Sequence, residues 1–350
     1  MRLPVVWSDD CLRHEPDGEL FVGVRTPGTE SPARADAIRE ALVEAGAGLV
    51  PAGRHADAAL LAVHDAGLVD YLRGAWAAWA ASGLADDPGQ DRVVPYVFPH
   101  RGLGARRAPA AVWARAGWFA YDTMTLVGPG TWEAARAAVD CALTAVDLVA
   151  AGAPAAYACV RPPGHHACRD CFGGSCYLNN AAVAAAALRE RLGGPVAVVD
   201  VDAHHGNGTQ ELFYDTADVV VASVHVDPGA GWFPHFLGHA DETGSGAGAG
   251  ANLNLPLAPG AGDEEWLAAV AEAAARAASA SGLVVSLGVD AAAGDPESPL
   301  RVSPAGFERA GRILGELGLP TVLVQEGGYD LATLGPLVRA VLLGFEAARG

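Results

Sequence analysis

The sequence predicts an α/β fold in which a parallel sheet carries helices on both faces. Short apolar runs rich in β-branched residues recur along the chain, and amphipathic helical segments separate several of them, as in βαβ units. The run at 196–201 has no polar residue before Asp200, which is typical of a strand buried on both faces. Ionisable residues directly follow several of these runs. Ligands in open α/β sheets bind outside the carboxyl ends of the strands, so we expect the functional site there.

The individual elements follow from the same patterns. Strands are expected at 3–7, 156–160, 196–201, 219–224, 283–289 and 321–325. Helices are expected at 31–46, 58–63, 68–79, 131–151, 179–192, 264–281 and 303–317. Two other segments are expected to form connections: a polar loop at 9–29, and a long Pro-, Gly- and Arg-rich connection at 82–115 that could be a lid or a dimer contact. No internal repeat or linker divides the chain, so residues 1–350 are expected to form a single domain.

Composition excludes several classes of partner and location. Hydrophobic residues make up 51% of the chain and charged residues 18%, which is typical of a globular protein. The net charge is −18 and no basic run exceeds two residues, which argues against nucleic acid or an anionic membrane as the partner. The apolar run before Asp9 is too short for a signal peptide. A cytoplasmic protein with reduced cysteines is therefore expected.

The clearest candidate for chemistry is a set of metal-ligating residues at two strand ends. Asp202 and His204 follow the run at 196–201, and Asp290 follows the run at 283–289. Side chains two residues apart in extended chain point the same way, so Asp202 and His204 can converge on one cation, with Asp200 behind them. Two carboxylates and an imidazole with an open position are typical of a catalytic zinc site. Either aspartate alone would more often cap the following helix.

Two further clusters could supply proton transfer and hydrogen bonding. Adjacent His165 and His166 follow a Gly-marked turn, where one of them could act as general base and acid. The segment Glu326-Gly-Gly-Tyr329 allows a tight turn that brings the Tyr329 phenol to the strand ends, where it could donate to an oxyanion. Surface histidines and ordinary turn chemistry are the alternative interpretations.

A C-x-x-C pair, Cys168 and Cys171, lies close to these histidines, with Cys176 a short way beyond. A structural zinc site would need a fourth ligand at matching spacing, and the sequence offers none. Free thiols on a loop are therefore expected, with a metal or redox role as the less favoured alternative.

Several of these motifs together resemble a known family. The segments RPPGHH, GGSCYLNNAAVAA, DVDAHHGNGTQELFY, SLGVD and QEGGY are similar to the histone deacetylase superfamily, in the correct order over nearly the whole chain. The segments FPHFLGHADETG and PGTWEAA are more similar to its bacterial acetylpolyamine amidohydrolase branch. The resemblance implies an arginase/deacetylase-type fold and a zinc-dependent amidohydrolase that removes an acetyl or other acyl group from an amine.

The resemblance also implies roles for individual residues. It implies one catalytic Zn²⁺ on Asp202, His204 and Asp290. It implies His166 as the base toward the zinc-bound water, with Asn207 behind it, and Tyr329 as the group that polarises the amide carbonyl.

A structural K⁺ or Na⁺ is implied as well. Asp200 matches both the partner of His165 and a ligand of this cation. Ser223 and the backbone carbonyls of Asp202, His204 and Val224 match the rest of the cation site.

Three features bear on the substrate channel. Ser175 stands where relatives usually carry an aromatic wall, with Phe233 as the opposite wall, so one side of the channel is expected to be wider or wetter. Residues 92–121 contain no Asp or Glu, although polyamine-selective relatives use acidic residues in this loop. Glu19 approximately matches another acidic position, near the N-terminus, that binds a cation in relatives of this family. Acetylpolyamines, acetyl-lysine and a small acylated amine of specialised metabolism therefore stay open as substrates. Separately, we expect the protein to form a homo-oligomer, namely a dimer.

Two other classes of function are less favoured. Arginase-like hydrolases share the fold but need a second metal-bridging carboxylate two residues after the D-x-H histidine, where this chain has Gly206. A non-catalytic binding homologue would normally have lost a metal ligand, a histidine or Tyr329, and this chain retains all of them.

Overall fold

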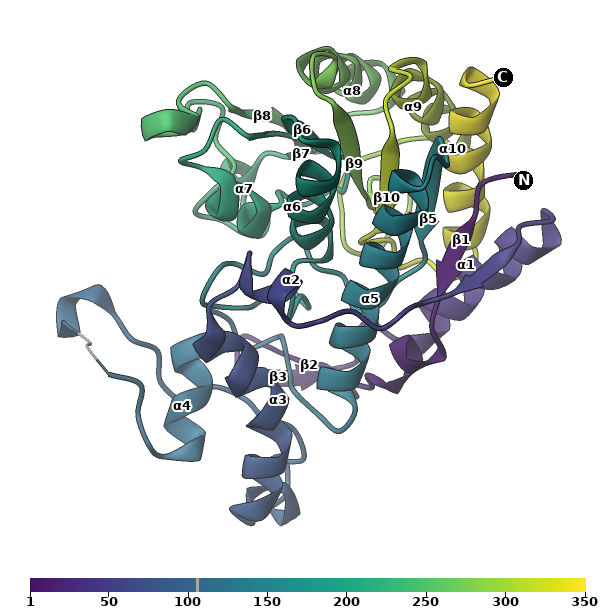
Figure 1. Ribbon diagram of the computed structural model, residues 1–350. Coiled ribbons are helices and arrows are strands. Elements are labelled where there is room, and N and C mark those ends of the chain that lie inside the picture. Colours follow the sequence, from purple (N-terminus) through teal and green to yellow (C-terminus); the bar gives the residue numbers. More distant parts are fainter. Residues whose placement is uncertain (105–106) are drawn as a thin grey trace.

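The computed structural model describes residues 1–104 and 107–350, and in this part of the chain the core is a parallel sheet of eight strands (Figure 1). Every pairing between neighbouring strands of this sheet is parallel, which confirms the predicted fold class. In spatial order the strands are β4 (Leu49–Pro51), β1 (Val5–Trp7), β5 (Ala155–Ala158), β10 (Thr321–Gln325), β9 (Gly282–Leu287), β6 (Val196–Asp200), β7 (Val219–Val226) and β8 (Asn252–Leu257).

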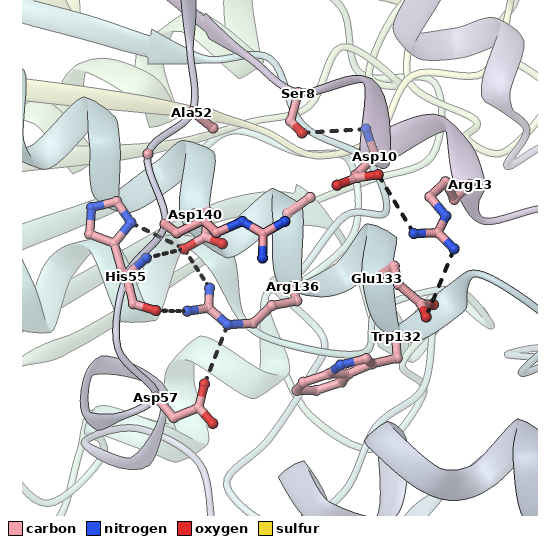
Figure 2. A pocket seen from close by; sticks show the side chains of 13 residues that line it. Ser8, Asp10, Arg13, Ala52, His55, Asp57, Trp132, Glu133, Arg136 and Asp140 are labelled. Carbon is pink, nitrogen blue, oxygen red and sulfur yellow. Dashed lines mark hydrogen bonds and ion pairs between the residues drawn. The ribbon is translucent and has the colours of Figure 1, made fainter.

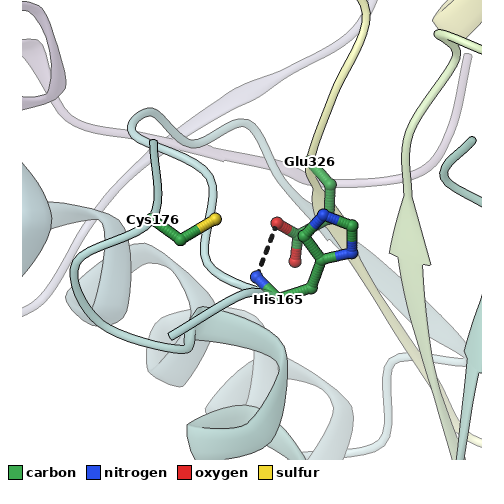
Figure 3. Close-up of side chains that lie close together, drawn as sticks. All are labelled: His165, Cys176 and Glu326. Atoms are coloured by element: carbon green, nitrogen blue, oxygen red, sulfur yellow. Dashed lines mark hydrogen bonds between the residues drawn. The ribbon is translucent and has the colours of Figure 1, made fainter. Parts of the chain in front are cut away.

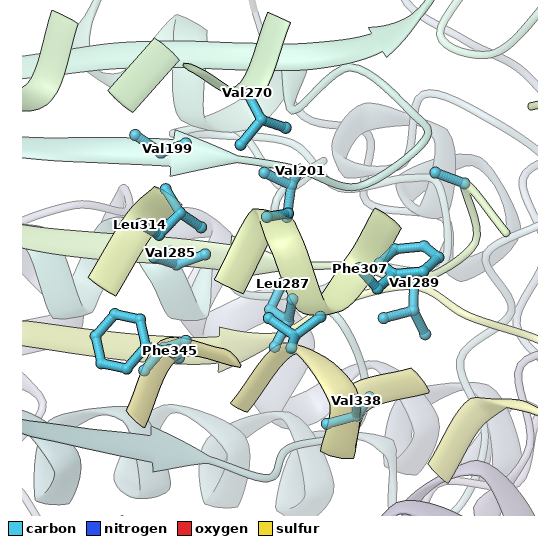
Figure 4. Packing of buried hydrophobic residues seen from close by; sticks show 14 of the residues in the cluster. Val199, Val201, Val270, Val285, Leu287, Val289, Phe307, Leu314, Val338 and Phe345 are labelled. Carbon is cyan, nitrogen blue, oxygen red and sulfur yellow. The ribbon is translucent and has the colours of Figure 1, made fainter. Parts of the chain in front are cut away.

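Alternate strand residues enter two apolar layers, one on each face of the sheet. Val199 and Val285 belong to one layer, part of which Figure 4 shows. Val198 and Val284 belong to the other. The first layer is covered by α1 (Pro32–Glu44), α8 (Asp263–Ala277), α9 (Pro304–Glu316) and α10 (Leu334–Ala348). The second is covered by α5 (Thr131–Ala150) and α6 (Asn180–Leu192). Burial on both faces explains why these strands are almost entirely apolar.

A third apolar cluster extends outward from α5 and α6. It includes α2 (Ala58–Leu61), α3 (Ala66–Ala81) and α4 (Val112–Phe119), and the rings of Tyr71 and Phe119 stack with their centroids 4.5 Å apart. The first two helices lie where the apolar spacing predicted them. The third was not predicted, because it follows a segment with little periodicity.

The predicted loop at 9–29 is wrong in part, because it contains regular structure. It begins with a 3₁₀ turn, η1 (Asp9–Arg13), and continues as an antiparallel hairpin of β2 (Glu19–Phe21) and β3 (Val24–Thr26). Val22 and Gly23 form the two-residue turn with φ of 49° and 79°. Positive φ at both central positions is typical of a type I′ hairpin turn, but a β-branched residue rarely adopts it, so composition hid the hairpin.

Other elements also escaped sequence analysis. Strand β4 is only three residues long, and β8 contains two asparagines and a proline. Helix α7 (Asn207–Phe213) begins inside the glycine-rich motif that follows β6. Helix α10 contains Gly335, Pro336 and Gly344, which weaken its helical signal, and tertiary packing against α9 stabilises it instead.

The predicted connection at 82–115 includes η2 (Leu84–Asp86), η3 (Arg101–Leu103) and the beginning of α4. Ala105 and Arg106 of this prediction lie outside the described residues. In Figure 1 the described residues around η3 extend away from the sheet. Among the helices that the structure describes, none is long and apolar enough to cross a membrane.

Candidate active site

The three predicted polar clusters meet at the carboxyl edge of the sheet. Strand β6 ends at Asp200 and leads into the D-x-H segment, while Asp290 follows β9. The tandem histidines follow β5, and Tyr329 follows β10. Since β5, β10, β9 and β6 are neighbours in the sheet, parallel pairing brings segments far apart in the sequence to one place.

Asp202, His204 and Asp290 form a compact group at this edge. One ligand atom of each lies within 4.8 Å of the others. His204 Nδ1 lies 3.1 Å from Asp290 Oδ2 and 3.3 Å from Asp202 Oδ1. Both carboxylates are buried. Burial, and then the charge of Asp202, raise the pKa of Asp290 to about 7.

This group fits a divalent metal ion. His204 Nε2 lies 3.0 Å from the carbonyl oxygen of Glu297, which can only accept, so Nε2 carries a proton and Nδ1 is the ring atom that would bind a metal ion. Donation of the distal ring N–H to a carbonyl is how metal-binding histidines are normally oriented. A dication would also offset the repulsion between two buried carboxylates.

The two histidines beside this group differ in charge. His165 Nδ1 lies 2.9 Å from Asp200 Oδ2. Burial opposes its protonated form, but the charges of Asp202 and Asp200 outweigh burial and raise the pKa of His165 to about 10. His166 Nδ1 instead donates to the amide oxygen of Asn207 at 2.7 Å. Burial and the charge of His165 lower the pKa of His166 well below its ordinary value, so His166 is a neutral base.

Gly206 leaves no room for the carboxylate that a two-metal site would need. A Cβ at this position would lie 2.3 Å from Asp200 Oδ2 and 3.4 Å from His165 Nδ1. An aspartate here would displace the pair that orients His165. The geometry therefore disfavours the arginase-like alternative.

Tyr329 is held at the rim of the site by its backbone and by Arg34. Its N–H donates to Asp295 Oδ2 at 2.8 Å. In the turn before it, Gly327 N donates to Asp202 Oδ2 at 2.7 Å, and a Cβ there would lie 2.3 Å from Asp290 Oδ2. Burial raises the pKa of Tyr329 well above 10, so its phenol remains a hydrogen-bond donor.

Glu326 supports the histidine segment from beneath. Its Oε2 accepts the backbone N–H groups of Gly164 at 2.7 Å and His165 at 3.2 Å. Cys176 lies beside them (Figure 3). The side chains of His165, Cys176 and Glu326 lie close enough to approach a metal, but the raised pKa of His165, about 10, keeps its imidazole protonated, and burial raises the pKa of the Cys176 thiol well above its ordinary value. We therefore interpret Glu326 as a support of the histidine turn.

A cavity of about 600 Å³ leads down to this group. His166, His204 and Tyr329 lie among its lining residues. The three predicted channel residues, Glu19, Ser175 and Phe233, line it too. The Phe233 ring meets the His166 ring edge to face, with the centroids 4.8 Å apart. The backbone of Ser175 lies in the left-handed region, with a φ of 61°.

Sequence analysis missed several residues of this cavity. Phe21 and Val22 enter it from the unpredicted hairpin, and Met124, Trp232 and Glu297 complete parts of the wall. Glu297 is the most informative of these, because it places a second carboxylate beside Glu19. Its position seven residues after Asp290, in the loop that carries Asp295, was the only sequence signal.

Comparison with known proteins decides the family. The model of the histone deacetylase domain matches residues 28–345. The chain belongs to the histone deacetylase family. Acetylpolyamine amidohydrolase 1 of Pseudomonas aeruginosa is 42% identical, covering 98% of this chain and 99% of that protein. Acetylpolyamine amidohydrolase of Mycoplana ramosa is 41% identical over 97% of this chain and 98% of that protein.

Solved structures of the family agree with the fold. A crystal structure of acetylpolyamine aminohydrolase from Burkholderia pseudomallei has a TM-score of 0.94 at 38% identity, covering 99% of this chain and all of that one. The HDA15 HD domain has a TM-score of 0.77 at 30% identity, covering this whole chain and 89% of that one. The resemblance inferred from the motifs, the arginase/deacetylase-type fold and the deacetylase class of enzyme are confirmed.

The predicted site for a monovalent cation lies one step further into the sheet. Asp200 of β6 is in register with Ser223 of β7, and Val224 follows it. Asp200 Oδ1 accepts the N–H of Asp202 at 3.1 Å, and Ser223 Oγ lies 2.8 Å from His225 Nδ1. The cation itself stays a prediction.

A separate cavity of about 370 Å³ lies beside the N-terminal half of α5 (Figure 2). Most of its charged side chains pair with one another. Arg136 Nη1 lies 2.7 Å from Asp140 Oδ1, and His55 Nδ1 lies 3.1 Å from the same oxygen. Because these paired charges offer no free base or metal-ligand group, we place the reaction at the carboxyl edge of the sheet and not here.

Proposed function

We propose that this protein hydrolyses the amide bond of an acylated amine, of the acetylpolyamine type, with one Zn²⁺ held by Asp202, His204 and Asp290. The observation that carries the proposal is the convergence of this ligand group, a neutral His166 and the Tyr329 phenol at the end of one cavity. Such a constellation suits hydrolysis of an amide by an activated water. The alternative of a non-catalytic homologue is disfavoured because the constellation is intact.

The bound zinc ion would polarise the amide carbonyl and lower the pKa of a water. The chain supplies the proton transfers. His166 Nε2, whose lone pair is free because Nδ1 donates to Asn207, accepts the proton of the attacking water. Tyr329 donates to the oxyanion as the carbonyl becomes tetrahedral. His165, held protonated by Asp200, keeps positive charge beside the developing anion, and the histidine pair then protonates the leaving amine.

A structural K⁺ or Na⁺ is proposed on Asp200, Ser223 and the backbone carbonyls of Asp202, His204 and Val224. Its role would be to offset the buried charge of Asp200, which otherwise faces the carboxylate of Asp202.

Two carboxylates in the cavity support a cationic substrate. Burial, and then the charges of Glu297 and Asp122, raise the pKa of Glu19. Thr29 Oγ1 donates to Glu297 Oε1 at 2.7 Å and fixes that carboxylate at the wall. An ammonium group of a polyamine would relieve the repulsion between these carboxylates. Residues 92–121 contribute no acid, but the cavity is still acidic because Glu19 and Glu297 come from other segments.

A second candidate is the deacylation of a small acylated amine with a longer acyl group. Ser175 favours it, because a small polar side chain lines the cavity at the position where relatives usually carry an aromatic wall. Competition between acetyl and longer acyl groups on one amine distinguishes the two candidates.

The segment around η3, together with helix α4, is proposed to contact a second copy of this chain. Tyr96 and Leu103 are 76% and 78% exposed, and Trp113 of α4 is 50% exposed. Exposed aromatic and aliphatic side chains are typical of an interaction surface. We therefore propose a homodimer. In each copy, residues 1–350 would form a single catalytic domain. The net charge of −18 supports the absence of nucleic acid and membrane partners and suits a cytoplasmic enzyme.

The test is a comparison of acetylputrescine, acetylspermidine and an acetyl-lysine peptide at equal concentrations, using zinc-loaded enzyme. The proposal expects hydrolysis of the two acetylpolyamines with higher kcat/KM than the peptide. Faster hydrolysis of the peptide would contradict the substrate class. If protein with stoichiometric zinc hydrolyses none of these amides, the proposal that it is an amidohydrolase is contradicted.

A further inference from the structure

Two cysteines that the reaction does not use lie beside the catalytic histidines. The chain folds back between Cys168 and Cys171, so that Cys168 N donates to the carbonyl oxygen of Cys171 at 2.8 Å. Cys168 is 8% exposed, whereas Cys171 is partly exposed. The backbone pairing therefore already holds the two cysteines next to each other, with Cys171 partly open to solvent.

The Cys168 thiol also contacts the group that orients the base. Asn207 Nδ2 donates to Cys168 Sγ at 3.8 Å, while Asn207 Oδ1 accepts from His166 Nδ1 at 2.7 Å. Cys168 Sγ additionally lies 3.7 Å from the backbone carbonyl of His166. One side-chain amide thus links the Cys168 sulfur to the imidazole.

We propose that Cys168 and Cys171 form a reversible disulfide that lowers the amidohydrolase activity. Bonding to Cys171 would draw the Cys168 sulfur away from the Asn207 amide and remove its contact with the His166 carbonyl. Asn207 Nδ2 would keep only its contact with the Tyr121 hydroxyl at 3.4 Å, so Asn207 would orient His166 less firmly. The effect on activity rests on the proposed function, whereas formation of the disulfide does not.

The oxidant for this step is a hydroperoxide such as hydrogen peroxide. Cys171, the more exposed sulfur, attacks the peroxide O–O bond, which breaks to give a sulfenic acid and one water. Cys168 then attacks the Cys171 sulfur, and the S–O bond breaks to release a second water. Two thiols and one peroxide give one disulfide and two waters. Two electrons pass from sulfur to oxygen, and both thiol protons leave in the waters.

The order of attack follows from the surroundings of the two sulfurs. Contact with Cys171, and then burial, raise the pKa of the Cys168 thiol well above its ordinary value. The thiolate is the reactive form, so the shielded Cys168 is the second sulfur to react. The other four cysteines, Cys11, Cys141, Cys159 and Cys176, are buried with no exposed surface. Oxidation should therefore select the C-x-x-C pair.

A dithiol reagent should reduce the disulfide again, because an attacking thiolate exchanges with it through a mixed-disulfide intermediate. Reversal distinguishes this modification from overoxidation to sulfinic acid, which a dithiol does not repair.

The experiment treats zinc-loaded enzyme with hydrogen peroxide, blocks free thiols, and then maps the sulfurs without reduction. Trypsin cuts after Arg169, between the two cysteines, so the disulfide links peptide 137–169 to peptide 170–189. Fragmentation of the linked pair then assigns the two sulfurs. The expected results are a Cys168–Cys171 link, a fall in kcat of about tenfold or more, and recovery with dithiothreitol.

Two variants complete the test. Cys171→Ser should keep basal activity and resist peroxide, while the matched control Cys141→Ser, a buried cysteine on α5, should stay sensitive. Inactivation without the Cys168–Cys171 link, equal sensitivity of Cys171→Ser, or a complete link with unchanged kcat would each overturn the proposal. If the untreated enzyme hydrolyses no acylated amine, the proposed function fails, and the peptide map still decides whether the disulfide forms.

Discussion

The guanidinium of Arg34 lies over the ring of Tyr329, with Cζ 4.6 Å from the ring centroid. The same group donates to the carbonyl oxygens of Glu326 and Gly328, on either side of Gly327, at 2.6 Å each. It also pairs with Glu30 at 3.0 Å, and all of these groups are buried or nearly so. Arg34 therefore connects helix α1 to the turn that presents the phenol, and fixes the ring at both its backbone and its face.

Arg34→Lys is expected to lower kcat about tenfold with little change in KM, because an ammonium cannot bond both carbonyls at once and the ring loses its planar partner. Arg34→Ala removes one partner of a buried pair and should cost about 3–5 kcal/mol of unfolding free energy. The control is Arg39→Lys on the same helix, which lies over Trp7 outside the cavity. Steady-state kinetics and chemical unfolding provide both readouts, and equal effects of the two lysine variants would refute the role of Arg34.

Tyr329→Phe tests the oxyanion donor itself. Removal of one oxyanion donor is expected to reduce kcat by roughly a hundredfold or more, while zinc content and unfolding free energy stay close to those of the parent. Tyr214→Phe, a tyrosine outside the cavity lining, is the matched control. An unaffected rate in Tyr329→Phe would exclude the proposed role of the phenol.

Asp202→Ala and Asp290→Ala are expected to lose bound zinc and activity together, because each removes one of three ligands. Zinc per chain can be measured by elemental analysis after dialysis against a weak chelator. Asp215→Ala, at an exposed aspartate, should keep full zinc occupancy. Stoichiometric zinc in either ligand variant would mean that the ion binds elsewhere.

Sequence patterns were sufficient wherever the signal is local. Asp202, His204 and Asp290 directly follow apolar strands, so their convergence follows from parallel pairing alone. Arg34 could not be found this way, since it belongs to an ordinary charged helix and acts through contacts with residues almost 300 positions away. Glu297 and the hairpin at 19–26 were missed for a similar reason, because a loop and a strained Val22 turn become cavity walls only in the folded chain.

Glu297→Gln and Glu19→Gln test the acidic part of the cavity. Each is expected to raise KM for acetylspermidine by about tenfold, because a charged partner of the distal ammonium is lost, with kcat nearly unchanged. The KM for a neutral acylated amine should not change. Glu264→Gln, on the far helix α8, serves as a control. A KM for acetylspermidine that is unchanged in both cavity variants would separate these carboxylates from substrate recognition.

Acid stability should depend on His64, which the fold keeps neutral. His64 Nε2 accepts the N–H of Asn179 at 2.9 Å, and Nδ1 lies 2.9 Å from the carbonyl oxygen of Cys168. Burial lowers its pKa from 6.5 to about 4. Between these values the unfolded chain binds a proton that the folded chain does not, so unfolding free energy falls as pH falls, by up to about 1.4 kcal/mol per pH unit.

His64→Gln should therefore reduce the slope of unfolding free energy against pH between pH 6.5 and 4, whatever its effect on absolute stability, while two other buried histidines, His14 and His225, keep their share of it. His100→Gln, at an exposed histidine, should leave that dependence as it is in the parent. Urea unfolding at several pH values measures both slopes. If the slope of His64→Gln equals that of the parent, His64 is protonated in the fold and the two hydrogen bonds do not hold it neutral.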